Sequence, residues 1–361
     1  MNTTAGSDGR SAGGGAGAES LASQLKAQAY GVGFDLAGIA TLGPADTASH
    51  FDEWLGHGYA GTMEYMERHT ELRRDSRLPQ PGMRSALVVG LNYGGTQPTG
   101  PIARYARGDD YHRLMWDRLE SLGTWLTTQA GGSSRAFVDT GPVLERDLAR
   151  RAGLGWFGKN TLLINPGLGS FFFIGALFTD LELQPDAPFE EDRCGTCRKC
   201  LDACPTNALV APRALDSTQC VSYLTIELRD AIPETLRPKI GDLLYGCDIC
   251  QDVCPWNISF ARELTEPAFA PRAALDNTDA RSLARELLAM DEETYRATFR
   301  NSAMKRAKLG GLKRNAAVVL GNVGDARDTA LLSEALTDAA PLVPEHATWA
   351  IAQIAVRTPN R

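Results

Sequence analysis

Eight cysteines lie within one short stretch of this 361-residue chain, and their spacing constrains that stretch more than any other feature does. The first four follow the pattern C-x2-C-x2-C-x3-C-P, and three of the others form a shorter run that ends in the same Cys-Pro pair. Thiols spaced this closely predict a metal- or cluster-binding module over residues 188–260. The cysteines are Cys194, Cys197, Cys200, Cys204, Cys220, Cys247, Cys250 and Cys254.

The spacing is that of a ferredoxin-like module with two 4Fe-4S clusters, in which three thiolates of a run hold one cluster and the fourth reaches the other. The second run lacks its first cysteine, because Leu244 stands there, so Cys220 is expected to replace it. With four ligands each, both clusters are expected to carry electrons rather than bind substrate. The expected sets are Cys194, Cys197, Cys200 and Cys254 for cluster one, and Cys204, Cys220, Cys247 and Cys250 for cluster two.

Structural zinc and a disulfide framework are the alternatives for these cysteines. Zinc sites normally use paired C-x2-C units without the third cysteine and the trailing proline. Disulfides are disfavoured in a reducing cytosol. A cytoplasmic protein without membrane attachment is expected, because we find neither a signal-peptide run nor an apolar stretch long enough to cross a bilayer. Residues 1–18, mostly small and polar, are expected to be a disordered tail.

Upstream of the cysteines, helical and strand patterns alternate, which predicts an α/β domain over residues 19–187. The expected helices cover 20–31, 109–129 and 142–153, the last with Pro142 at its first position, and the expected strands cover 34–40, 85–94, 134–139, 162–166 and 170–178. Gly153, Gly155 and Gly158 satisfy G-x-G-x-x-G. A dinucleotide site is not expected there, because a helix precedes these glycines where the fingerprint requires a strand.

Downstream of the cysteines, residues 271–361 are expected to be entirely helical. The segments 314–322 and 345–354 look like paired helices of a short HEAT-type repeat. The formal net charge of −7 opposes a general attraction to polyanions. A local run from Arg296 to Arg314 nevertheless contains seven cations and no acidic residue, so it is a candidate nucleic-acid surface.

Four segments resemble the epoxyqueuosine reductase family, in order and spacing, and the similarity runs from about residue 20 to the C-terminus. They are ARYARGDDYH, SRAFVDTGPVLERDLARRAGLGWFGKNTLLI, CVSYLTIELRDAIPE and GCDICQDVCPWN. The resemblance implies a cobalamin-dependent enzyme that acts on epoxyqueuosine at the wobble position of a tRNA anticodon. It removes the epoxide oxygen and leaves a cyclopentene, which is the last step of queuosine formation. A flavodoxin or ferredoxin as electron donor, and a monomeric state, are also expected.

The resemblance also implies roles for individual residues. Asp139, at a strand end, is the expected proton donor to the departing oxygen; the alternative is a helix N-cap or turn aspartate before Gly141-Pro142. Cobalamin is expected with its own base detached and no protein imidazole beneath it. Its expected contacts are Arg104, Tyr105, Lys159, Asn160, Thr161, Ser170, Ser222, Cys247 and Asp248. The expected tRNA contacts are Thr225, Lys305, Arg306, Lys308, Lys313 and Arg314.

The chemistry agrees with the parts read from the sequence. Turning an epoxide into an alkene and water takes two electrons and two protons, so the reaction needs an electron relay and an acid. Two alternatives stay open at this point. One is another cobalamin and iron-sulfur reductase of the reductive dehalogenase kind, and the other is a plain two-cluster electron carrier fused to a structural domain.

Overall fold

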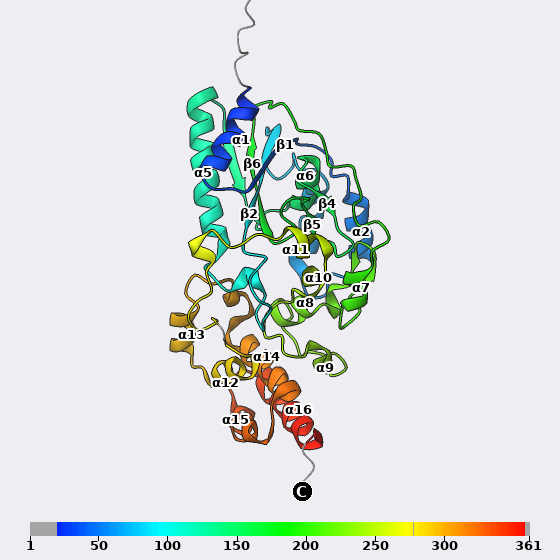
Figure 1. Ribbon diagram of the computed structural model, residues 1–361, viewed down its shortest axis with the longest axis vertical. Helices are drawn as coiled ribbons and strands as arrows, with labels where there is room; N and C mark the ends of the chain where they lie inside the picture. The colour runs from blue at the N-terminus through cyan, green and yellow to red at the C-terminus, as the bar shows by residue number, and fades with distance from the viewer. Residues whose placement is uncertain (1–19, 277, 358–361) are drawn as a thin grey trace, which may run out of the picture.

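The computed structural model describes residues 20–276 and 278–357, so the expected tail over residues 1–18 lies outside the described residues. Figure 1 shows three tiers along the long axis: a sheet with its helices, a loop-rich middle that carries the cysteines, and a helical end. Among the described residues, no helix is both long and apolar enough to span a bilayer.

The N-terminal tier is built on a four-stranded sheet in the order β1-β2-β6-β3. Every pairing in this sheet is antiparallel. The expected alternation of helices and strands is therefore confirmed as a mixed α/β arrangement, and its sheet is antiparallel rather than of the parallel type. The strands are β1 (Leu36–Thr41), β2 (Ser85–Asn92), β6 (Phe172–Thr179) and β3 (Ser134–Phe137).

Helices cover both faces of this sheet, which explains why all eight residues of β2 are buried. Helices α1 (Leu21–Gly31) and α5 (Tyr111–Ala130) pack on one face, side by side in Figure 1. Helix α6 (Glu145–Arg151) packs on the other. The prediction that Pro142 opens this helix was wrong, because α6 begins three residues later at Glu145.

The remaining elements of the N-terminal tier are short. They are α2 (Ala48–Gly56), α3 (Glu64–Glu67), α4 (Thr70–Arg74), η1 (Arg104–Ala106), and a hairpin of β4 (Trp156–Phe157) and β5 (Leu163–Ile164). The hairpin explains the glycine pattern, since a Cβ on Gly155 would lie 2.1 Å from the carbonyl oxygen of Ile164. Gly153 and Gly155 lie between α6 and β4 and pack against backbone atoms, whereas Gly158 follows β4 inside the hairpin, a different setting from the dinucleotide fingerprint.

The cysteine module consists of short helices and one small hairpin joined by turns. Cys-Pro pairs end the two runs, and Pro255 opens the helix that follows the second run. Its elements are α7 (Lys199–Ala203), β7 (Leu209–Ala211), β8 (Ala214–Leu215), η2 (Ser217–Gln219), α8 (Val221–Ile226), α9 (Arg237–Ile240), α10 (Ile249–Asp252) and α11 (Pro255–Phe260).

The C-terminal tier is helical throughout its described residues, as expected, and α14 packs against both α12 and α16. The two segments read as paired helices fall in α14 and α16. The elements are η3 (Pro267–Phe269), α12 (Ala280–Ala289), α13 (Glu292–Thr298), η4 (Ala303–Ala307), α14 (Lys308–Val323), η5 (Ala326–Asp328), α15 (Thr329–Glu334), η6 (Ala335–Thr337) and α16 (Leu342–Arg357).

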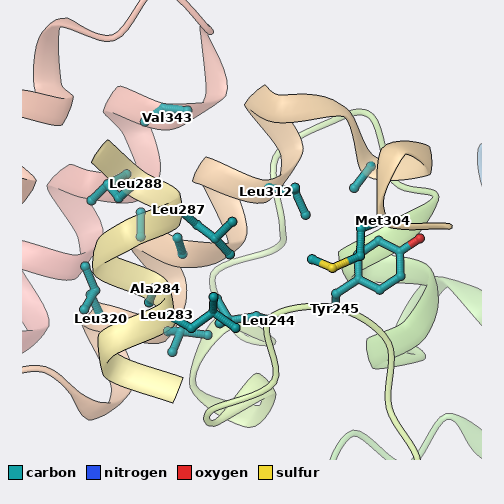
Figure 2. Packing of buried hydrophobic residues seen from close by; sticks show 14 of the residues in the cluster. Leu244, Tyr245, Leu283, Ala284, Leu287, Leu288, Met304, Leu312, Leu320 and Val343 are labelled. Carbon is teal, nitrogen blue, oxygen red and sulfur yellow. The ribbon is translucent and has the colours of Figure 1, made fainter. Parts of the chain in front are cut away.

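One apolar core joins this helical tier to the cysteine module (Figure 2). Leu244 and Tyr245, which directly precede the second cysteine run, are fully buried among Leu287, Met304 and Leu312. The Tyr245 hydroxyl donates to the carbonyl oxygen of Ala303 at 2.6 Å. Because burying a side chain of this size contributes roughly 1.5–3 kcal/mol, the helices hold the cysteine loop in place.

Candidate cluster and substrate site

The thiols of Cys194, Cys197, Cys200 and Cys254 surround one small cavity. All four line a space of about 190 Å³, together with Lys159, Arg193, Lys199 and Trp256 among other residues. Cys254 interacts electrostatically with Cys194 and Cys197, although more than fifty residues separate them along the chain. These cysteines carry free thiols. Four thiols around a compact space suit a cube-shaped iron-sulfur cluster.

The other four thiols form a second group beside the first. Cys247 interacts electrostatically with Cys220 and Cys204, and Cys250 does so with Cys247 and Cys220. Cys250 also interacts with Cys200 of the first group, so the two groups adjoin. All eight cysteines are free, and no disulfide is formed among them. The structure brings together the same two sets of four that the spacing predicts, and the assignment of each set to one cluster stays a prediction.

Lys159, Asn160 and Thr161 lie in the β4–β5 hairpin, next to the cysteine loops. Lys159 Nζ donates to the carbonyl oxygens of Gly195 at 2.5 Å and Cys197 at 2.9 Å. Asn160 Nδ2 donates to the carbonyl oxygen of Cys250 at 3.3 Å. Thr161 occupies the turn with a left-handed backbone, at φ 70°. The hairpin therefore fastens the two cysteine runs to the sheet, and a direct cofactor contact by these three residues stays a prediction.

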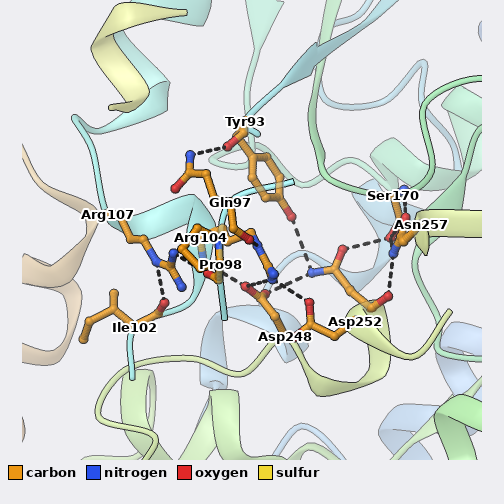
Figure 3. A network of polar contacts seen from close by, with 11 residues as sticks. Tyr93, Gln97, Pro98, Ile102, Arg104, Arg107, Ser170, Asp248, Asp252 and Asn257 are labelled. Carbon is orange, nitrogen blue, oxygen red and sulfur yellow. Dashed lines mark hydrogen bonds and ion pairs between the residues drawn. The ribbon is translucent and has the colours of Figure 1, made fainter. Parts of the chain in front are cut away.

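Arg104 and Asp248 belong to one buried polar network, drawn in Figure 3. Arg104 is only 5% exposed, and its guanidinium lies 4.8 Å from the ring centroid of Phe171. Its backbone N–H and Nη1 donate to Asp248 Oδ2 at 2.8 and 3.2 Å, and Nη1 also donates to Asp252 Oδ1 at 2.6 Å. Because these partners come from η1 and α10, the network locks the second cysteine run against the N-terminal tier.

Ser170 extends this network towards β6. Its hydroxyl donates to Gln251 Oε1 at 2.8 Å and accepts from Asn257 Nδ2 at 2.9 Å, and Gln251 Nε2 donates to Asp248 Oδ1 at 3.1 Å.

Gln97, in the loop before η1, differs from these residues because one of its side-chain atoms has no hydrogen-bond partner among the described residues. Its Oε1 is buried without a hydrogen-bond partner among the described residues. A buried acceptor of this kind fits a ligand that carries amide N–H donors.

Two further candidate residues lie near cluster two. Ser222 is half-buried and hydrogen-bonds the thiol of Cys220 through its hydroxyl and its backbone N–H. Tyr105 is half-buried, packs against Tyr245, and interacts electrostatically with Asp139. Burial raises the pKa of the Tyr105 phenol well above its usual range, so it stays protonated. Ser222 therefore contacts a cysteine of the second group, and Tyr105 lies between Tyr245 and Asp139.

Asp139 follows β3 by two residues and lies at a strand end, as expected. Its backbone is left-handed at φ 54°, and its side chain is 68% exposed. The alternative of a helix N-cap was wrong, because Leu144 holds the cap position of α6. Asp139 lies in a bend of the chain after β3, and its role as the proton donor stays a prediction. Residues other than glycine that are held in this backbone region are enriched at functional sites.

The Asp139 carboxylate is oriented by α5. The Tyr111 hydroxyl donates to Asp139 Oδ2 at 2.8 Å, and His112 Nε2 lies 4.0 Å from the same oxygen. Tyr111 is itself fixed, since its ring stacks on Phe173 with centroids 4.0 Å apart. The loop after Asp139 is also closely packed, because a Cβ on Gly141 would lie 2.4 Å from the ring of Phe137. An exposed carboxyl group that is oriented by a hydrogen bond to one of its oxygens can contact a bound substrate with the other.

Glu145, which the sequence did not single out, lies beside this acid. Its Oε1 is buried and has no hydrogen-bond partner among the described residues. Burial, reinforced by the negative charge of Asp139, raises the pKa of Glu145 to about 8. In the sequence, a glutamate in the first turn of a helix is an ordinary favourable charge. No sequence pattern distinguishes this glutamate, because its burial depends on tertiary packing.

Two of the expected tRNA contacts were wrong. Thr225 is fully buried, and its hydroxyl donates to the Val221 carbonyl and accepts from the Gly246 N–H. Arg314 is 1% exposed, and it donates to the carbonyl oxygens of Leu224, Leu228 and Asp230. A guanidinium that satisfies the carbonyls after a helix end is structural, so neither side chain is available to a phosphate.

The rest of the basic run divides by exposure. Lys305, Arg306 and Lys308 are exposed, whereas Lys313 is half-buried in an ion pair with Asp338 at 2.7 Å. Arg306 pairs with Glu227 at 2.7 Å, and its guanidinium lies 5.4 Å from the ring centroid of Tyr65. Tyr65 in turn interacts electrostatically with Asp139. Arg306 is therefore the exposed cation of this run that Tyr65 links to Asp139.

Comparisons with known proteins agree with this geometry. Residues 193–257 match the family model described as 4Fe-4S double cluster binding domain. Residues 73–140, which end just after Asp139, match the model described as Epoxyqueuosine reductase QueG, DUF1730. The double-cluster match sets aside structural zinc and disulfides as the role of these cysteines.

Relatives from bacteria match this chain over most of their length. The chain is 41% identical over 345 residues to the epoxyqueuosine reductase of Xanthomonas campestris, covering 92% of this chain and 96% of that one. It is 40% identical to the Escherichia coli epoxyqueuosine reductase, covering 92% and 89%.

Solved structures superpose closely as well. A crystal structure of epoxyqueuosine reductase with an epoxyqueuosine-modified tRNA-Tyr stem loop gives a TM-score of 0.84 at 32% identity, covering 92% and 89% of the two chains. The Bacillus subtilis epoxyqueuosine reductase, in a form whose catalytic aspartate loop is swung out of the active site, gives 0.81 at 31% identity with the same coverage. The chain therefore belongs to the epoxyqueuosine reductase family.

Proposed function

We propose that this protein removes the epoxide oxygen of epoxyqueuosine in tRNA and yields queuosine. The observation that carries the proposal is the pairing of two four-thiol groups with an exposed, oriented carboxylic acid in one folded body. The thiol groups supply electrons through two 4Fe-4S clusters, and Asp139 supplies a proton. Reduction of an epoxide to an alkene and water requires both.

The two clusters are proposed on the crossed sets of cysteines. Cys194, Cys197, Cys200 and Cys254 hold cluster one around the cavity, and Cys204, Cys220, Cys247 and Cys250 hold cluster two. The electrostatic neighbours of Cys254 and Cys247 support this division. Each cluster carries one electron at a time. A flavodoxin or ferredoxin is the proposed electron donor, and the protein is proposed to act as a monomer.

Cobalamin is proposed between cluster two and Asp139, bound with its own base detached and without a protein imidazole beneath it. Tyr105, Ser222 and the backbone of Cys247 are the proposed contacts, and the buried acceptor of Gln97 suits the amide groups at the edge of a corrin. Arg104, Ser170 and Asp248 keep the surrounding walls in place. When bound, cobalamin supplies a cobalt centre that passes the electrons to the substrate.

The protein's own part in the chemistry is binding and proton delivery. Tyr111 holds Asp139 Oδ2, which leaves the other carboxyl oxygen free to face a substrate. Asp139 donates a proton to the departing epoxide oxygen, so the oxygen leaves as a hydroxyl group rather than as an unfavourable alkoxide. Protonation at this point is what a carboxylic acid at an exposed strand end can provide.

The tRNA surface is proposed to be formed by Lys305, Arg306 and Lys308, together with the neighbouring residues of η4. Phosphate contacts of this kind position a nucleic acid, while the modified base turns out of the loop into the Asp139 pocket. We further propose that the chain divides into units at residues 19–187, 188–260 and 271–361. The core shared by Leu244 and α12 ties the last two units together.

The proposal is tested by anaerobic reconstitution with iron, sulfide and cobalamin, followed by incubation with epoxyqueuosine-containing tRNA and a reductant. Mass spectrometry of the nucleosides is expected to show loss of one oxygen with the native chain. A reconstituted protein that binds cobalamin yet leaves the nucleoside unchanged would contradict the proposed function. A protein that binds no cobalamin would instead be a two-cluster electron carrier.

The tRNA surface is tested by combining Lys305→Glu with Lys308→Glu. Binding of the tRNA should weaken, and the slope of log Kd against log salt should fall by about one for each phosphate that the variant no longer binds. Lys239→Glu, an exposed lysine on α9, makes the same type of charge change and serves as the control. An unchanged salt slope in the double variant would remove these lysines from the interface.

A further inference from the structure

The reaction consumes two protons, whereas Asp139 holds one. The substrate gains two electrons and two protons as two C–O bonds break, an alkene forms and the oxygen leaves as water. Asp139 therefore has to be protonated again within one turnover, or a second acid must act. Of the groups near Asp139, the buried carboxyl of Glu145 on α6 is the candidate for either role that has an unpaired oxygen among the described residues.

Glu145 is the first residue of α6 and is separated from Asp139 by the close-packed loop of Gly141. Its Oε1 is sealed from solvent and has no hydrogen-bond partner among the described residues. No ion pair within 4.0 Å is formed by this carboxyl either, in the part of the chain that the structure describes. A carboxylate with one oxygen buried and unpaired is disfavoured even though its own backbone N–H hydrogen-bonds the carboxyl, so the neutral acid is the favoured form.

We infer that Glu145 is a proton-relay residue that reprotonates Asp139 between the two proton transfers of one turnover. This inference rests on the proposed function and names a residue that acts through Asp139 rather than on the substrate. The electrons still come one at a time from a reduced flavodoxin- or ferredoxin-type carrier through the clusters. The balance is then an epoxide, two electrons and two carboxylic-acid protons giving an alkene, water and two carboxylates, which solvent reprotonates.

The groups around Glu145 fit this role. Asp139 faces it from the β3–α6 loop, Arg146 from its own helix, Arg73 from α4 and Tyr111 from α5. The negative charge of Asp139 raises the pKa of Glu145, while the two arginines lower it less than burial and Asp139 raise it. When Glu145 gives its proton to an ionised Asp139, the single negative charge moves from the exposed carboxyl to the more buried one, which is unfavourable. Transfer of the Glu145 proton to Asp139 therefore proceeds only while the substrate keeps consuming the proton that Asp139 holds.

The test compares Glu145→Gln with native protein in single turnovers of the reduced, cobalamin-loaded enzyme on bound tRNA. We expect Glu145→Gln to slow product formation by roughly 10- to 100-fold, within the usual range for proton transfer by a positioned group. The fall in native rate on the alkaline side should also be lost from its pH profile, and tRNA affinity should be unchanged. Glu120→Gln, an exposed glutamate on α5, is the matched control.

A measurement independent of turnover tests the same point. In infrared difference spectra, the native protein at about pH 7, below the pKa of a buried acid of this kind, should show the carbonyl stretch of a protonated carboxylic acid, and Glu145→Gln should lack it. Where Glu145→Gln lowers the cluster content, Glu145→Asp supplies the comparison and should keep the band with a partial rate. A native rate and pH profile in Glu145→Gln would overturn the relay. If native protein fails to remove the oxygen, the proposed function fails instead, while the infrared result still reports on Glu145.

Discussion

The Arg104 network and the region around Asp139 are both rich in charge, yet the hydrogen bonding of their charged groups differs. Arg104 has the partners it needs in Asp248, Asp252 and the Gln97 carbonyl, and the unpaired oxygen of that network belongs to the neutral amide of Gln97. Around Asp139, Tyr111 supplies one hydrogen bond, and the unpaired buried oxygen belongs to the carboxyl of Glu145. Buried polar groups are normally satisfied, so an exception calls for a functional explanation. The first region stabilises the fold, and the second keeps groups ready for proton transfer.

Asp139→Asn should separate function from stability most sharply. The amide keeps the shape of the carboxyl, and its oxygen can still accept a hydrogen bond from Tyr111. The free energy of unfolding should therefore change little. The proton is lost, and product formation should fall by about 10² to 10⁴-fold. Nucleoside mass spectrometry after a fixed incubation measures the loss, with cluster absorbance as the control for intact protein. Near-native conversion would mean that Asp139 is not the acid.

Arg104→Met should show the opposite behaviour. Removing the guanidinium leaves Asp248 and Asp252 buried without their cation, and breaking a buried pair of this kind costs roughly 3–5 kcal/mol. The midpoint temperature of thermal unfolding and the iron content of the purified protein should therefore both fall. Arg113→Met removes an exposed ion pair with Asp117 and should change stability by less than about 0.5 kcal/mol. Equal effects of the two variants would contradict the structural role of the network.

His346 is a buried titratable group whose two ring nitrogens both have hydrogen-bond partners, so it can be compared with Glu145. It is fully buried, accepts from the Ile232 N–H at 3.1 Å and contacts the Leu342 carbonyl, and burial lowers its pKa to about 4. Since the folded pKa lies below the ordinary value of about 6.5, the folded state disfavours the protonated imidazole. Its contribution is complete above about pH 6.5 and is lost as the pH falls towards about 4, by up to about 3 kcal/mol.

Amide hydrogen exchange of α16 measures this effect. Protection in the native protein should decline as the pH is lowered, after correction for the intrinsic exchange rate. His346→Gln keeps an acceptor and a donor but does not titrate, so its protection should be flatter with pH. If the protection of α16 declined equally with pH in the native protein and in His346→Gln, the loss of stability would come from other titratable groups.

Tyr111→Phe should give the smallest effect. The stacked ring on Phe173 is kept, and only the hydrogen bond to Asp139 is removed, which contributes about 0.5–1.5 kcal/mol when the acceptor is a neutral carboxylic acid. The rate should fall roughly tenfold, with little change in tRNA affinity. The comparison of KM with kcat distinguishes orientation of the acid, which lowers kcat, from weaker substrate binding.

Local patterns in the sequence were enough for much of this protein. The cysteine spacing predicted the double-cluster module, and the family match confirms that module. Apolar periodicity placed α5 and the helices α14 and α16, because a helix that buries one face repeats it every turn. The resemblance carried by separated motifs indicated the family, and relatives that cover nearly the whole chain confirm it.

Only the tertiary structure decided how exposed individual side chains are and which distant residues they pair with. The sequence shows Arg314 as one more cation in a basic run, yet the fold buries it against the carbonyls that follow α8. It shows Glu145 as an ordinary helix-start glutamate, yet the packing of α6 beside the Asp139 loop buries its oxygen away from every donor among the described residues. Spacing is local and can be read along the chain. Solvation and charge pairing depend on residues far apart in sequence, so they appear only once the chain is folded.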